Sequence, residues 1–173
     1  MRKRTITTAC IAGALGALLW TEEAKAEGFS WGHATLNGGP RFASENLDFG
    51  LGLNVGYTLD MGLYLGGLAE WYFDGRGADV SFFMFDIGYD IGFGDKFVLR
   101  PSGSVGIGTV WFDRCAPIGG CDNDSSTDFG MTGGVNAIYA ISKLTIGGEV
   151  RLFWVNDFDD VGIWGGFNIG VVF

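Results

Sequence analysis

Six ionisable side chains stand among apolar residues inside long segments, and this placement makes them the first candidates for chemistry. They are Glu70, Asp86, Asp90, Arg100, Glu149 and Arg151. Carboxylate and guanidinium groups that lie close together form charge-assisted hydrogen bonds, and a positioned carboxylate can also transfer protons. Because the chain neighbours of these residues are apolar, we expect the six side chains to point to one side of their segments and to meet in a common interior.

The polar segment 113–128 carries a second group of candidates. Cys115 and Cys121 lie in it, and an even pair of cysteines in an exported chain predicts a disulfide. The acidic run that begins at Asp122 partly matches a calcium-binding loop, but the glycine and the final glutamate of such a loop are missing. Acidic runs in loops are usually solvated, so we predict no metal centre and no cofactor.

The elements that position these residues are predicted to be β-strands. Residue types alternate over ten or more positions, and no segment keeps a helical period. The alternation predicts strands at 29–36, 47–59, 62–73, 80–93, 97–112, 128–141, 144–155 and 162–173. Tight turns near 60–62, 94–96 and 142–143 alternate with longer polar connections at 37–46, 74–79, 113–127 and 156–161. Short turns on one side and longer loops on the other predict an all-β fold, an eight-stranded antiparallel up-and-down transmembrane β-barrel.

The two faces of the predicted strands differ in polarity. One face carries large apolar residues, as in the run Phe83, Phe85 and Ile87, whereas the other collects the six ionisable residues with Asn54, Thr58 and other polar side chains. A soluble barrel would bury the apolar face, and alternation alone does not say which face is wet. Charges that face a narrow interior and aromatic residues near the strand ends favour the membrane barrel over a lipocalin-like one.

The amino-terminal 26 residues are predicted to be a signal peptide. Three basic residues, Arg2 to Arg4, precede an apolar run of 12 residues, and Ala24-Lys25-Ala26 supplies a cleavage site. A run of this length is too short for a membrane-spanning helix, which needs about 20 residues. The predicted mature domain, residues 27–173, then holds seven basic and 18 acidic residues, a net charge of −11. This charge argues against nucleic acid as a partner.

The last predicted strand resembles the carboxy-terminal signal of outer-membrane proteins, in which a terminal aromatic residue follows apolar residues at every second position. The matching residues are Phe167, Ile169, Val171 and Phe173. The resemblance implies export to the outer membrane and recognition by the barrel-assembly machinery. In architecture the chain is similar to the small barrels of the OmpA and OmpX type. Its length implies the barrel alone, without a peptidoglycan-binding domain.

Two classes of function agree with this pattern. The first is a non-enzymatic barrel with a structural or surface-interaction role. For it we expect outer-membrane lipid and lipopolysaccharide as partners, and a monomeric state. The second is a narrow passive channel for small or apolar solutes, as in the OmpW type. Barrel enzymes that act on lipid A combine a histidine with a nearby serine, and the deacylase among them has a His-x-Ser motif. The single histidine here is His33, and the residue two positions after it is Thr35 rather than serine. Catalysis requires assembled geometry, so we predict that the chain is not an enzyme.

An eight-stranded barrel has an interior only wide enough for its own side chains, and this constraint bears on the six ionisable residues. Buried ions must be paired, so we predict a plug of ion pairs and hydrogen bonds. The alternative is a gated pore in which Arg100 or Arg151 exchanges carboxylate partners.

Overall fold

The computed structural model describes residues 31–43, 46–74, 78–116, 120–156 and 158–173, all of which belong to strands or to the connections between them. The strands are β1 (Trp31–Ala43), β2 (Asn46–Thr58), β3 (Leu63–Asp74), β4 (Ala78–Tyr89), β5 (Ile91–Phe93), β6 (Phe97–Ala116), β7 (Gly120–Ile141), β8 (Leu144–Val155) and β9 (Phe158–Val172). The predicted signal peptide, residues 1–26, lies outside the described residues. No helix within the described ranges is long and apolar enough to cross a membrane.

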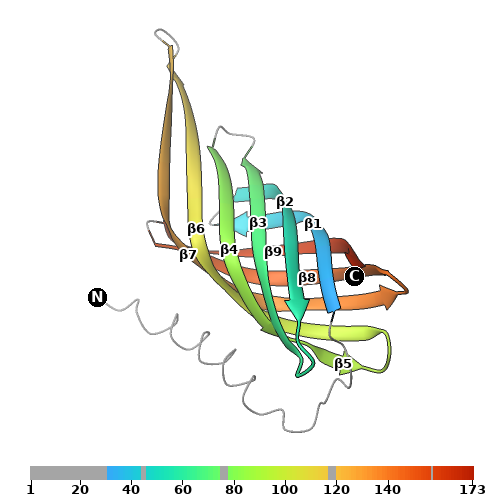
Figure 1. The fold of residues 1–173 in the computed structure, drawn as a ribbon. Coiled ribbons are helices and arrows are strands. Elements are labelled where there is room, and N and C mark those ends of the chain that lie inside the picture. The colour runs from blue at the N-terminus through green and yellow to red at the C-terminus, as the bar shows by residue number, and fades with distance from the viewer. Residues whose placement is uncertain (1–30, 44–45, 75–77, 117–119, 157) are drawn as a thin grey trace.

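The strands form one closed antiparallel barrel (Figure 1). Each strand pairs with its neighbours in the chain, and β1 pairs with β9 to close the ring. β4 and β5 both pair with β6 and are separated by Asp90 alone, so they are successive parts of one strand. The nine labelled elements therefore form a barrel of eight strands, as the sequence predicts.

Two stretches that the sequence predicts as loops are strands instead. β1 continues to Ala43, where the sequence predicts a loop at 37–46, and every residue from Trp31 to Ala43 pairs with β2. β6 continues to Ala116 and β7 begins at Gly120, although the sequence predicts an irregular loop at 113–127. Glycine and polar residues suggest loops when read alone, but pairing with a neighbouring strand satisfies their backbone groups equally well. The result is a long hairpin that rises beyond the other strands (Figure 1).

The three tight turns lie at the opposite end of the barrel from this hairpin. Gly62, Gly94 and Ser142 have φ angles of 86°, 68° and 60°. Left-handed backbone of this kind is common in short hairpin connections, and glycine adopts it without steric cost. In outer-membrane barrels the short turns lie on the periplasmic side. This end is called the turn end below, and the other the loop end.

The outward face is apolar and the inward face holds the polar residues, as the alternation predicts. Phe83, Phe85 and Ile87 on β4 are about half exposed, whereas Asp86 between them is 1% exposed. A soluble protein rarely exposes an apolar surface this extensive. Lipid is the solvent that suits it.

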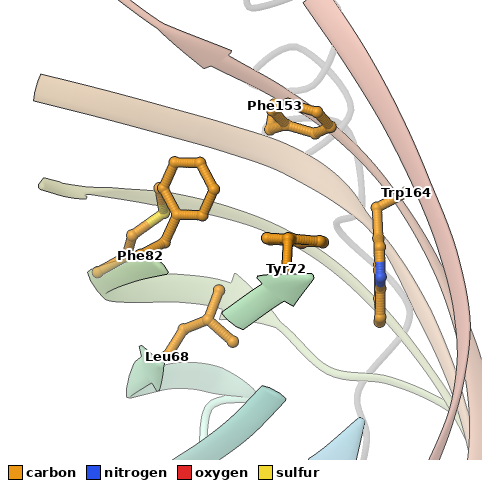
Figure 2. Close-up of a cluster of buried hydrophobic side chains, with 6 residues drawn as sticks. Leu68, Tyr72, Phe82, Phe153 and Trp164 are labelled. Atoms are coloured by element: carbon orange, nitrogen blue, oxygen red, sulfur yellow. The ribbon is translucent and has the colours of Figure 1, made fainter. Parts of the chain in front are cut away.

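The interior also contains apolar side chains, whereas the sequence analysis assigned mainly polar residues to the inward face. Near the loop end, six buried residues pack into one cluster (Figure 2): Leu68, Tyr72, Phe82, Met84, Phe153 and Trp164. Near the turn end, Trp31, Val98 and Ile138 form a second cluster. Inward glycines make room for the rings, because a Cβ at Gly166 would lie 2.6 Å from Trp164 and a Cβ at Gly108 would lie 2.7 Å from Phe82.

Candidate functional site

The polar lumen between the two apolar clusters contains all six ionisable residues, arranged in two networks. The network nearer the turn end is centred on Arg100, which β6 carries into the lumen. Its guanidinium binds Asp90 through two hydrogen bonds, the Nη2 bond being 2.8 Å long. Thr58 donates to the same carboxylate at 2.7 Å. Bidentate arginine–carboxylate pairs are among the strongest polar contacts in proteins.

Arg100 also reaches across the barrel. Its Nη1 donates to His33 Nε2 at 2.8 Å, so this histidine nitrogen accepts and the ring is neutral. The ring of Tyr64 lies 3.8 Å from the guanidinium carbon of Arg100 and stacks on His33 at 5.0 Å. β6 and β1 are four strands apart in either direction around the ring. Arg100 therefore connects opposite walls.

A chain of hydrogen bonds from neutral donors extends from this network toward the middle of the lumen. Asp86 accepts from Asn54 Nδ2 at 3.1 Å and from Ser104 Oγ at 2.8 Å. Asn54 in turn accepts from the Tyr64 hydroxyl, and Thr132 donates to Ser104 at 3.0 Å. Asp86 is thus held by amide and hydroxyl donors rather than by a direct ion pair.

The second network is centred on Arg151 and lies nearer the loop end. Arg151 Nη1 donates to Glu70 Oε1 at 3.2 Å, and Nη2 donates to Glu149 Oε2 at 2.9 Å. Glu70 also accepts from the Tyr72 hydroxyl at 2.8 Å, which joins this network to the apolar cluster above it. All three charged side chains are less than 5% exposed.

The buried charges do not balance within the described residues. Four buried carboxylates, from Glu70, Asp86, Asp90 and Glu149, accompany two buried guanidinium groups. In the described part of the chain, Glu149 Oε1 has no hydrogen-bond partner, nor does His33 Nδ1. Unpaired buried groups are costly, so these two atoms are among the places where a proton or water would relieve the lumen.

Side chains that the sequence analysis did not single out complete these networks. Tyr64 and Tyr72 bridge charged and apolar layers, and Arg41 lies over the rings of Tyr72 and Phe153 at 4.8 and 4.5 Å. Along β3, both tyrosines occupy the same alternate positions as Leu68 and Glu70. This shared phase is the signal that assigns the tyrosines to the interior.

The other predicted site residues lie elsewhere on the barrel. Cys115 and Cys121 are paired directly opposite each other in the β6–β7 register, but their side chains lie outside the described ones, so the disulfide stays a prediction. The side chains at the start of the acidic run, Asp122 to Asp124, are likewise outside the described ones. Among the described residues no group of three or more metal-ligating side chains comes together.

The residues of the predicted assembly signal project outward from β9. Phe167, Ile169, Val171 and Phe173 are 83%, 56%, 46% and 75% exposed. Phe173 also joins β9 to β1, because it exchanges two backbone hydrogen bonds with Gly32, at 3.0 and 2.9 Å. The predicted signal thus lies along the seam that closes the ring.

Solved structures with this architecture include small outer-membrane barrels. The Neisserial surface protein A superposes with a TM-score of 0.65 at 14% identity, covering 82% of this chain and 97% of that one. The amino-terminal barrel domain of Pseudomonas aeruginosa OprF superposes with a TM-score of 0.55 at 14% identity, covering 84% of this chain and 100% of that one. The Yersinia pestis attachment invasion locus protein Ail superposes with a TM-score of 0.54 at 14% identity, covering 82% of this chain and 99% of that one.

The chain has the fold of the small outer-membrane β-barrels. No family model matches it, and no curated protein matches it in sequence. At 14% identity the likeness concerns the fold alone, and it agrees with the OmpA and OmpX type expected from the sequence. The outer-membrane location expected from the sequence is supported by this fold and by the apolar outward face.

Proposed function

We propose that the chain is a non-enzymatic outer-membrane barrel with a closed lumen, which acts through its surface rather than by conducting solutes. The observation that carries this proposal is the pair of contacts between opposite walls, Arg100 with His33 and Arg151 with Glu70. An eight-stranded barrel has room for little more than its side chains. Two arginine side chains that cross this bore, between two apolar clusters, leave little space for a permeation path.

The position of His33 supports a non-enzymatic role. The histidine is 2% exposed and its Nε2 accepts a hydrogen bond from Arg100. A histidine base for acyl chemistry needs a free ring nitrogen beside a nucleophile at the membrane surface. Ser104 donates to Asp86 inside the lumen instead.

The β6–β7 hairpin is the surface element to which we assign interactions. β4 pairs with β6 only as far as Phe112, and β8 pairs with β7 only from Gly130 onward. Between these limits, β6 and β7 pair with each other and with no further strand in the described residues. Unpaired strand edges accept additional strands, and extended peptides bind in this way. We propose outer-membrane lipid and lipopolysaccharide around the wall, the barrel-assembly machinery during insertion, and a monomer as the working state.

Planar bilayer conductance tests the closed lumen. We expect no channel events from the wild-type barrel, and none from Arg151→Ala, because the apolar clusters still cover both ends of the polar lumen. Stepwise conductance from the wild type would overturn the proposal and favour the passive channel.

Protease treatment of intact cells tests the hairpin. Cleavage within 113–129 is expected, whereas cleavage confined to the tight turns would contradict the assigned orientation.

A further inference from the structure

A small pocket lies on the barrel wall at the loop end, where β3, β4 and β6 run side by side (Figure 1). Its volume is about 250 Å³, and Trp71, Tyr72, Phe73, Asp79, Val80 and Trp111 line it. This volume is below the range of about 300–1,000 Å³ that is usual for drug-sized ligands. The pocket therefore suits one chemical group of a larger molecule.

Strand register places a carboxylate between two aromatic side chains in this pocket. Asp79 is the direct partner of Phe73 on β3 and of Trp111 on β6. Phe73 and Trp111 are 51% and 43% exposed, which puts both rings on the outward face. Trp71, at 39% exposed, lies two residues before Phe73 and packs edge-on against Phe83 at 5.8 Å. Three aromatic rings and one carboxylate thus share the outward face.

Asp79 departs from the apolar character of that face. Among strand residues whose side chains are described, it is the one charged group that points outward, and none of the described ion pairs or hydrogen bonds involves it. Charge on a lipid-facing surface is unfavourable, although the cost decreases toward the membrane interface. A cation from outside the barrel would offset this cost.

We propose that this pocket binds the ammonium group of a membrane-lipid headgroup. Tryptophan rings attract organic cations through their faces, and the Asp79 carboxylate supplies the opposite charge. Aromatic residues at the strand ends lie at the level of the headgroups, which brings the pocket to the ligand. A headgroup with phosphate but no amine would be repelled by Asp79.

Titration with short-chain lipids tests the proposal on the full barrel folded in non-ionic detergent micelles. Dihexanoyl phosphatidylethanolamine and phosphatidylcholine are expected to shift the indole N–H signals of Trp71 and Trp111 in a ¹H–¹⁵N NMR spectrum. Phosphatidylglycerol with the same acyl chains is expected to leave them in place. Asp79→Asn should weaken the apparent affinity about fivefold, the effect of losing one partly exposed ion pair.

Asp95→Asn is the matched control, since Asp95 is an exposed acid in a tight turn at the opposite end of the barrel. It should leave the titration unchanged. Equal shifts with phosphatidylglycerol, or unchanged affinity in Asp79→Asn, would overturn the proposal. Choline chloride that bound as tightly as the choline lipid would overturn the assignment to a lipid.

Discussion

Arg151 and Glu70 form an ion pair across the full width of the barrel, with Nη1 and Oε1 3.2 Å apart. The two residues are 81 positions apart in the chain, and β8 and β3 stand four strands from each other in either direction around the ring. No backbone hydrogen bond can join such walls, because ladders connect neighbours only. The ion pair thus joins opposite walls of the barrel directly, a contact that the strand ladders cannot make.

Removal of Arg151 should destabilise the barrel strongly. Arg151→Met leaves Glu70 and Glu149 buried without a cation, and breaking a buried pair in this way costs about 3–5 kcal/mol. Urea unfolding in phospholipid vesicles measures the effect. The triple variant E70Q/E149Q/R151M removes the stranded charges and should recover most of the loss. A triple variant as unstable as Arg151→Met would show that the guanidinium acts by packing alone.

Tyr64 should be sensitive to small increases in the volume around it. A Cβ at Gly56 would overlap the Tyr64 ring, which packs against Arg100 and His33. Gly56→Ala should therefore lower the free energy of unfolding by about 1–3 kcal/mol, as overpacking does. Gly67→Ala is the control, since the nearest atom to its Cβ is Met84 O at 4.0 Å on the open outward face. Equal effects at both positions would argue against steric pressure on Tyr64.

The predicted disulfide between Cys115 and Cys121 should protect the hairpin and leave the barrel unaffected. The two residues are direct partners in an antiparallel ladder, a spacing that a disulfide can bridge in non-hydrogen-bonded pairs. Closing so short a loop stabilises by about 2 kcal/mol, and only the hairpin gains. Thiol labelling is expected only after reduction, and Cys115→Ser should speed proteolysis within the hairpin. Labelling of the untreated oxidised protein would refute the disulfide.

Loss of the Phe173 ring should impair assembly in cells more than stability in vitro. The backbone bonds between Phe173 and Gly32 do not depend on the side chain, so Phe173→Ala should unfold in urea within about 1 kcal/mol of the wild type. We expect the heat-modifiable fraction in outer membranes to fall severalfold if the residue is read by the assembly machinery. Parallel losses in both measurements would assign the ring a packing role only.

Much of the fold was predictable because alternation and turn length are local properties. Glu149 and Arg151 alternate with Gly148, Val150 and Leu152, and this pattern alone assigns their faces. The extent of β1 was not predictable in this way, since residues 37–43 become a strand through their pairing with β2 and β9. The same holds for the hairpin at 113–127. Pairing of this kind depends on tertiary context, which overrides local composition.

The candidate site was predictable as a set of residues but not as a set of contacts. Asp86 and Asp90 alternate in the same phase and both face inward, yet Asp90 binds Arg100 whereas Asp86 binds Asn54 and Ser104. Which partner each carboxylate receives depends on the stagger between strands, and no local pattern encodes it. The apolar clusters were missed for a related reason: alternation assigns Tyr72 or Trp164 to the inward face, but which apolar side chains meet there depends on the stagger between strands.

The contact between β1 and β9 has a consequence for the order in which the chain acquires its structure. Leu36 and Ile169 are 133 positions apart, whereas every other seam of the ring joins strands that follow one another closely. Contacts between distant positions form slowly because a long loop must first be closed. Until that happens the sheet is an open ribbon with two free edges inside a bilayer that cannot hydrogen-bond them. Folding and insertion of this barrel must therefore finish together, at the seam where Gly32 meets Phe173.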